Sequence, residues 1–154
     1  MHSFEENIMQ LGINIPDVPV PLANYVPYKV SDNVVYVSGQ GPVLNGDLMY
    51  KGKVDEDISI EDGIKAAEIC CINVIAALKK SINGDWKRLD GFLKLGGFVN
   101  CKDDFYDQPK IINGASDLLV KIFGDQGRHA RFAVGSNALP MNISVEIDAI
   151  IKIK

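Results

Sequence analysis

The last quarter of the chain shows the clearest alternation of apolar and polar side chains. Along residues 143–153, apolar residues occupy every second position through Ile147 and Ile151, and Ser144, Glu146 and Asp148 lie between them. A period of two over this length is typical of a strand with one face in a core. The pattern therefore predicts a half-buried strand that ends the chain.

A shorter apolar run, residues 130–134, precedes that strand and contains a single cation, Arg131. Pro140 stands between the two segments, and because proline lacks an N–H donor, strand pairing is expected to stop there. We therefore expect two neighbouring strands joined by a turn. Arg131 and Glu146 could then face one pocket.

A helical period, with apolar residues three and four positions apart, marks residues 59–82. Ser59 can cap its start, and Asn83-Gly84 is a typical end. One face is apolar, and the other is expected to carry Lys65, Glu68, Asn73 and Lys80. The pattern predicts a long helix that covers a sheet.

Two further helices are predicted. Residues 107–123 have Asp107 as a capping residue, Pro109 in the first turn and Gly124 just after the end. Residues 3–11 have Ser3 as a cap candidate and acidic residues in the first turn. Residues 13–22 follow with three prolines, which favour an extended connector.

The remaining apolar segments predict strands. Residues 25–30 and 34–38 are rich in aromatic and β-branched side chains and are separated by Ser31-Asp32-Asn33, which is typical of a hairpin. Residues 44–50 contain a second tight turn at Asn45-Gly46-Asp47. Residues 91–100 form a further strand.

This order of elements predicts an α+β fold, with a mixed sheet and two helices packed on one face. The chain of 154 residues fits a single domain, residues 1–154, in which residues 1–20 form an N-terminal helix and connector.

Composition narrows the possible functions. The net charge is −4 at pH 7 and the cations are scattered, so nucleic-acid binding is unlikely on electrostatic grounds. No apolar run approaches the ~18 residues of a membrane span. The three cysteines form no CxxC pair, and residues 2–6 are polar, so no signal peptide is expected. Reduced cysteines and a cytoplasmic location are the corresponding expectations.

Several kinds of catalytic site are poorly supported. Gly39-Gln40-Gly41 follows a strand but lacks the third glycine and the helix of a phosphate-binding loop. Ser136 with His129 could form a nucleophile and base, although the flanking residues differ from a nucleophile elbow. The two histidines are far apart in sequence and the cysteines are unpaired, so no metal site is expected.

Arg131 and Glu146 leave two interpretations open. They could form a structural cross-strand ion pair, which contributes only about 0–1 kcal/mol when exposed. Alternatively, Arg131 offers a bidentate fork to a small carboxylate ligand, and Glu146 orients or activates a water beside it.

The chain resembles the Rid family (YjgF-like, often labelled endoribonuclease L-PSP), the reactive-intermediate imine deaminases. The resemblance covers nearly the whole chain after Val20 and lies in the spacing of a few short motifs: Tyr25, Ser38-Gly39-Gln40, Ala130-Arg131, Leu139-Pro140 and Val145-Glu146-Ile147.

The resemblance implies a chorismate-mutase-like fold assembled as a homotrimer, with ligand sites in the clefts between subunits. Arg131 would clamp the carboxylate of a 2-imino acid or its enamine tautomer, and Glu146 would position the attacking water. The other implied site residues are Tyr25, which would close the pocket, Ser38 and Gly39, which would line it, and Asn113, which matches a helix asparagine of the family.

Three departures from the family pattern bear on the substrate. The N-terminal extension through Pro21 and the Gly127-Arg128-His129 lead into Arg131 differ from the best-characterised deaminases, and Phe132-Ala133 stands where those often have Ser-Cys. These departures indicate a divergent branch of the family, and the substrate of such a branch need not be 2-aminoacrylate. The expected activity is cofactor-free hydrolysis of small imino acids to 2-oxo acids and ammonia. The alternatives are a trimer that binds a small carboxylate without turnover, and a ribonuclease, as the family label suggests.

Overall fold

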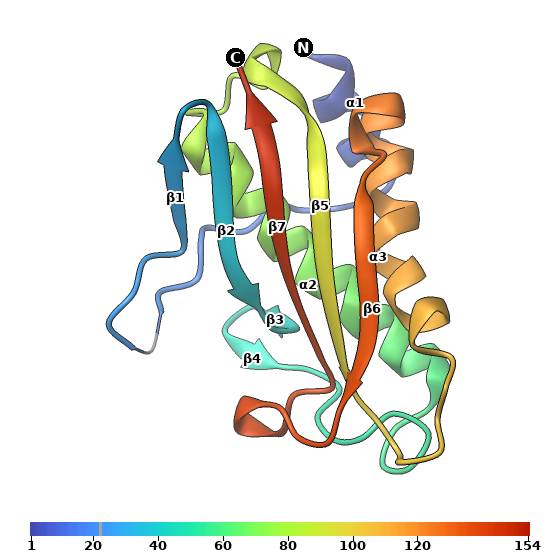
Figure 1. The fold of residues 1–154 in the computed structure, drawn as a ribbon. Coiled ribbons are helices and arrows are strands. Elements are labelled where there is room, and N and C mark those ends of the chain that lie inside the picture. Colours follow the sequence, from blue (N-terminus) through green and yellow to red (C-terminus); the bar gives the residue numbers. More distant parts are fainter. Residues whose placement is uncertain (22) are drawn as a thin grey trace.

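A five-stranded mixed sheet forms the centre of the computed structural model, which describes residues 1–21 and 23–154 (Figure 1). Its strand order is β1-β2-β7-β5-β6. The strands are β1 (Tyr28–Ser31), β2 (Val34–Gln40), β5 (Leu89–Asn100), β6 (Ala130–Ser136) and β7 (Val145–Ile153). β5 and β6 are parallel, and the other neighbours are antiparallel. The predicted α+β class with a mixed sheet is confirmed.

The predicted pairing of the last two strands is wrong, because β5 lies between β6 and β7. β5, α3 (Gln108–Phe123) and β6 form a strand–helix–strand crossover, which makes β6 parallel to β5. With one side of β5 occupied, β7 pairs along its other side. The short helix η3 (Pro140–Asn142) lies in the connection that carries the chain past the end of β5.

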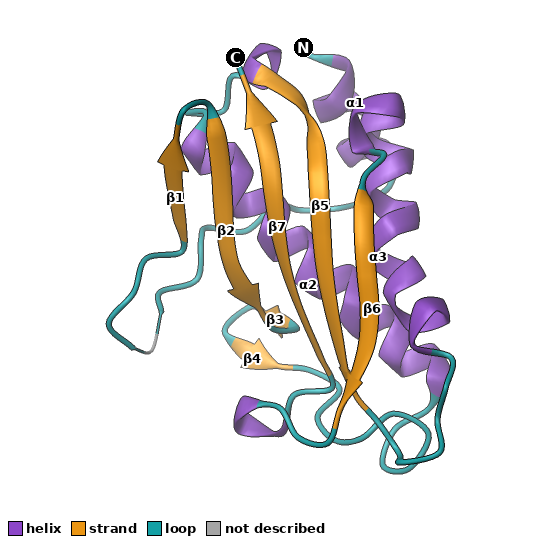
Figure 2. Ribbon diagram, viewed as in Figure 1, coloured by secondary structure: helices purple, strands orange, loops and turns teal. Residues whose placement is uncertain are grey.

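Helices α2 (Ile60–Ser81) and α3 cover one face of the sheet (Figure 2). As predicted, the Ser59 hydroxyl caps α2 by accepting a hydrogen bond from the Asp62 N–H at 3.1 Å, and Asn83 and Gly84 end it with φ angles of 55° and 74°. Asp107 precedes α3 but makes no side-chain capping bond.

A third helix, α1 (Ser3–Gln10), packs beside α3. Its cap is His2 and not Ser3, because His2 Nδ1 accepts a hydrogen bond from the Phe4 N–H at 3.2 Å. Phe4 contacts the rings of Trp86 and Phe123, and Glu5 accepts bonds from Trp86 Nε1 at 2.5 Å and Lys79 Nζ at 3.0 Å. These contacts anchor the start of the chain to the helix layer.

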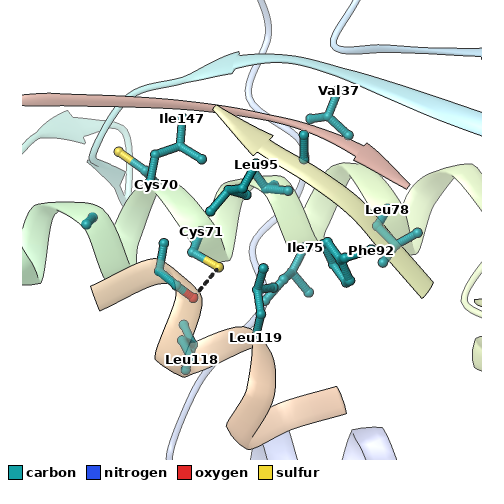
Figure 3. Packing of buried hydrophobic residues seen from close by; sticks show 14 of the residues in the cluster. Val37, Cys70, Cys71, Ile75, Leu78, Phe92, Leu95, Leu118, Leu119 and Ile147 are labelled. Carbon is teal, nitrogen blue, oxygen red and sulfur yellow. Dashed lines mark hydrogen bonds between the residues drawn. The ribbon is translucent and has the colours of Figure 1, made fainter. Parts of the chain in front are cut away.

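The core lies between the sheet and the two long helices. Figure 3 shows Ile147 of the sheet beside Cys70 of α2, and Cys71 and Ile75 of the same helix facing Leu118 and Leu119 of α3. Burial raises the pKa of the Cys71 thiol, and the nearby Glu68 raises it further. A buried thiol of this kind is inert as a nucleophile, so the adjacent cysteines serve packing.

Asn73 is expected on the polar face of α2, but the structure places it in the buried interior. It is 1% exposed, and its Nδ2 donates to the carbonyls of Gly41 at 3.1 Å and Val43 at 3.0 Å. Val43 belongs to a small hairpin, β3 (Val43–Leu44) and β4 (Asp47–Leu48), which turns at Asn45-Gly46 as predicted. Asn73 therefore fastens this hairpin to the helix layer.

The proline-rich segment after α1 has neither helix nor strand in residues 13–21, in agreement with the predicted connector. Leu22, the last residue of that connector, lies outside the described residues. The segment runs across the molecule from α1 to the β1 side (Figure 1), and Ile13 and Ile15 pack against the core. Among the helices of the described chain, none is long and apolar enough to cross a membrane.

Candidate functional site

Arg131 lies on β6, at an edge of the sheet, and points toward the helix layer. Its register partner is Leu95, which is fully buried beneath the helices. Nη1 donates to the Ser116 hydroxyl at 3.0 Å and Nη2 to the Pro109 carbonyl at 3.3 Å, both on α3. No carboxylate of residues 1–21 or 23–154 lies within ion-pair distance of this guanidinium.

His129 completes a hydrogen-bonded chain behind Arg131. Its Nδ1 lies 2.6 Å from the Gly127 carbonyl, which can only accept, so Nδ1 is the donor of this bond. Nε2 lies 2.9 Å from the Ser116 hydroxyl, whose oxygen accepts from Arg131 Nη1. This hydrogen-bonded relay of His129, Ser116 and Arg131 holds the guanidinium in one position.

The serine beside His129 is therefore Ser116 and not Ser136, whose pairing with His129 is poorly supported by the sequence. The Ser136 hydroxyl donates instead to the Ala138 carbonyl at 2.6 Å. Ser116 and His129 are 13 positions apart and meet only because α3 packs along β6. No local sequence signal identified this pair.

Asn113 shares a cavity of about 240 Å³ with Arg131, Ser116 and His129. Asn113 and Arg131, two of the predicted site residues, therefore line the same cavity. The cavity is open to solvent, and it offers an amide and a guanidinium, the donor types that bind a carboxylate.

Glu146 lies in a different place, on the face of the sheet that no helix covers. Its neighbours Val145 and Ile147 point into the core, whereas Glu146 is half-buried and pairs with exposed Phe98. It lines a cavity of about 440 Å³ together with Tyr25, Gly39 and Met141. Three of the predicted site residues therefore meet here.

Gly39 is required by this arrangement. A Cβ atom at that position would lie 2.6 Å from Glu146 Oε1, closer than real Cβ contacts. Ser38 is adjacent but is not among the residues that line the cavity. Its hydroxyl donates to the Val26 carbonyl at 2.6 Å and its N–H to the Pro27 carbonyl at 2.9 Å. Ser38 thus holds the segment that carries Tyr25.

The carboxyl of Glu146 is electrostatically perturbed. Burial raises its pKa, and the Asp148 carboxylate, two positions along the same strand face, raises it further. Burial also raises the pKa of Asp148, against the lowering effects of the Gly96 N–H and of Lys94. A carboxylate with a raised pKa is a better proton acceptor near neutral pH. Asp148 is a contributor that the sequence reasoning did not single out.

Arg131 and Glu146 do not meet within one chain. Leu95 and Phe98, their register partners on β5, are three positions apart in a regular stretch, so they point to opposite faces. The interpretation of Arg131 and Glu146 as a cross-strand ion pair is therefore wrong. A single chain presents two half-sites, the Arg131 cavity and the Glu146 cavity, which share no lining residue.

Within the described ranges, residues 1–21 and 23–154, no group of three or more His, Cys, Asp or Glu side chains is placed to hold a metal ion. The polar side chains that line the two half-sites carry guanidinium, imidazole, hydroxyl, amide, phenol and carboxyl groups.

Comparison with known proteins gives consistent results. Residues 5–150 match the model of the family described as "YjgF/chorismate_mutase-like, putative endoribonuclease". Protein TCP17 of Trypanosoma cruzi is 36% identical over 148 residues, which are 96% of this chain and 92% of TCP17.

Solved structures agree. Protein Atu1372 of Agrobacterium tumefaciens, a protein of unknown function, is 42% identical with a TM-score of 0.93, over 99% of this chain and 93% of that one. E. coli TdcF with bound serine is 20% identical with a TM-score of 0.64, over 88% of this chain and 92% of that one, and it shares the fold.

Proposed function

The chain belongs to the YjgF/chorismate mutase-like family, and on that premise we propose that it is a hydrolytic deaminase of small 2-imino and enamine carboxylic acids. The products are the 2-oxo acid and ammonia. The C=N carbon of an imine is already electrophilic, so the reaction requires positioning of the substrate and of one water, which side chains alone can supply.

The separation of the two half-sites is the observation that carries this proposal. One half-site holds a fixed guanidinium with no carboxylate partner in the described chain, and the other holds a carboxyl group with a raised pKa. The Glu146 cavity has no cation among its lining residues, so a carboxylate ligand bound there needs a guanidinium from elsewhere. In a homotrimer, as the family resemblance implies, Arg131 and Asn113 of one subunit complete the cavity of Tyr25, Gly39 and Glu146 of the next.

The uncovered sheet face supports such an assembly. Phe98 and Phe132 stack edge to face there with ring centroids 5.3 Å apart, and Val134 is 42% exposed. An apolar face of this kind is stabilised when a second copy of the chain covers it.

In the proposed mechanism, Arg131 binds the substrate carboxylate through its two terminal nitrogens. Glu146 accepts a proton from a water whose oxygen attacks C2 of the imine, and the C=N π electrons move to nitrogen. The resulting carbinolamine loses ammonia after a proton returns to nitrogen, and the C2–OH becomes the carbonyl of the 2-oxo acid. An enamine first gains a proton at C3. The serine bound to E. coli TdcF supports a family preference for small carboxylates.

Ammonia release tests the proposal. Imines are generated in situ by an amino-acid oxidase from Leu, Met, Ala and Phe, and wild type is compared with Arg131→Ala. Loss of the guanidinium should lower kcat/KM by roughly 100-fold, because a charge-assisted bidentate contact is removed. Arg128→Ala is the matched control, since Arg128 lines the same cavity but bonds to Asp125. Unchanged turnover in Arg131→Ala would contradict the proposal.

A mixing experiment tests the shared site. Arg131→Ala and Glu146→Gln should each be inactive alone. After the two proteins are denatured together and refolded at equal amounts, roughly a quarter of the interfaces in a cyclic trimer pair an intact Arg131 with an intact Glu146. Activity should return to that extent. No recovery, in refolded protein of trimeric mass, would show that the two residues do not share a site.

Two other outcomes remain distinguishable. Tight binding of 2-oxo acids without any acceleration would identify a binding module. RNA cleavage would support the ribonuclease label, although a net charge of −4 disfavours binding to a polyanion. Cleavage retained in Arg131→Ala would place that activity outside this site.

A further inference from the structure

A second cavity, of about 410 Å³, adjoins the Glu146 cavity. The two cavities share four lining residues, Pro19, Val20, Val43 and Met141. All four are apolar, so the passage between the cavities offers no charged group. The volume of each cavity lies in the range that accommodates small ligands.

The N-terminal segment forms one wall of this second cavity. On that side it is lined by Pro16, Pro19, Val20 and one charged residue, Asp17, and on another side by Val43 and Leu48 of the small hairpin. Val20 is 85% exposed and Met141 is 51% exposed. Apolar side chains left uncovered beside a cavity are available to bury part of a ligand.

The wall is held in place from several directions. Proline fixes φ at two of its positions, Ile13 and Ile15 pack against the core just before it, and Asn73 bonds to the backbone at Val43. A preformed apolar wall loses little conformational entropy on binding.

Met141 has a backbone conformation that non-glycine residues rarely adopt, with φ at 56°. The flanking turn holds it there through bonds from Asn142 N–H to the Leu139 carbonyl at 3.1 Å and from Ile143 N–H to the Pro140 carbonyl at 3.2 Å. Strained residues of this kind concentrate at ligand sites, and the flexible thioether of methionine adapts to different apolar shapes.

We infer that this second cavity is the side-chain pocket of the site, and that it selects substrates with a large apolar side chain. The inference rests on the proposed function. With the C=N group at Glu146 and the carboxylate at Arg131 of the next subunit, the side chain extends between Val20 and Met141 into the second cavity. The N-terminal segment is thereby a determinant of specificity. Imino acids with branched aliphatic, thioether or aromatic side chains are the substrate class.

Specificity constants test this inference. Wild type should process imines derived from Leu, Met and Phe with kcat/KM at least about tenfold above the Ala-derived imine, the scale on which apolar pockets discriminate. Val20→Asp and Met141→Asp each place a charge in the wall and should remove that preference, measured within each variant as the ratio of the Leu-derived to the Ala-derived kcat/KM. Val30→Asp is the control, because Val30 is exposed at 43% and lines neither cavity.

The outcomes separate this inference from the proposed function. Turnover of all imines with no size preference, or a preference that survives both wall variants, overturns the side-chain pocket and leaves the deaminase intact. If no imine is turned over, the affinities of the protein for pyruvate and for 4-methyl-2-oxopentanoate are measured by calorimetry, and their comparison tests the side-chain pocket. Tighter binding of the larger acid that is lost in Val20→Asp supports the pocket. Equal binding, or none, overturns it.

Discussion

Glycine at position 39 shows how a single missing methyl group shapes the Glu146 half-site. A Cβ there would lie 2.6 Å from Glu146 Oε1, and the carboxylate would have to move. We predict that Gly39→Ala folds with wild-type thermal stability, because the displaced atom is the end of a flexible side chain, and that kcat falls by roughly 10- to 100-fold. Gly41→Ala is the control, since its Cβ would meet apolar atoms of Ile143 and Leu48, the nearest at 3.2 Å, and not Glu146. Equal activity of both variants would show that the position of Glu146 is unimportant.

Ser116 tests the relay behind Arg131. Its hydroxyl bridges His129 Nε2 at 2.9 Å and Arg131 Nη1 at 3.0 Å. Without it, the guanidinium loses one anchor but keeps its charge. Ser116→Ala should therefore raise KM about five- to tenfold, with kcat changed less than twofold. Ser116→Thr keeps a hydroxyl and should recover most of the affinity. A matching loss in both variants would point to altered helix packing.

Asp148 affects the proton affinity of Glu146, because the two carboxyl groups repel each other when both are charged. In Asp148→Asn, the pKa of Glu146 should fall. A general base works only when deprotonated, so the acidic limb of the kcat/KM profile should move to lower pH. A profile measured from pH 5 to pH 9 checks this. An unmoved limb would mean that another group controls it.

Among the structural elements, the small hairpin depends on a single amide from α2. Asn73 donates to the carbonyls of Gly41 and Val43, and Asn73→Ala leaves both without this donor. The free energy of unfolding should fall by about 1–3 kcal/mol, measured by urea denaturation with an unchanged m-value. Glu68→Ala, on the exposed face of the same helix, should change it by less than ~0.5 kcal/mol. Equal small losses would show that the hairpin holds without Asn73.

For the whole molecule, the raised pKa of Asp148 has a consequence for stability. The folded state holds the proton of the Asp148 carboxyl more tightly than the unfolded state does. At pH values between the ordinary pKa of an aspartate, about 4, and the raised pKa, the unfolded state therefore binds fewer protons than the folded state. Stability therefore falls as pH rises through that window, and the full cost is present above it.

Asp148→Asn removes this cost. At pH 7 the variant should be more stable than wild type by about 0.5 kcal/mol, a small value because the partly exposed carboxylate is screened by solvent. Below pH 4 the difference should vanish. Thermal unfolding at equal protein concentrations checks both points. A wild-type protein that is more stable at pH 7 would contradict the direction of the pKa shift.

The local features of this protein, its helix ends and its turns, can be predicted from the sequence alone. The helical period and the capping Ser59 defined α2, and turns that favour positive φ defined the hairpins at Asp32-Asn33 and Asn45-Gly46. These features rest on interactions between residues close in the chain, which hydrophobic period and turn chemistry record directly. The spaced motifs also identified the family, and with it the fold.

Contacts between residues that are far apart in the chain depend on the tertiary structure and could not be predicted from the sequence. The tertiary structure placed β5 between β6 and β7, and so put Arg131 and Glu146 on opposite faces. It also joined Ser116 to His129 and brought the N-terminal segment beside the Glu146 cavity. The physical reason is that alternation shows which side chains share a strand face but not which strand lies alongside, because pairing partners are selected by packing over the whole chain.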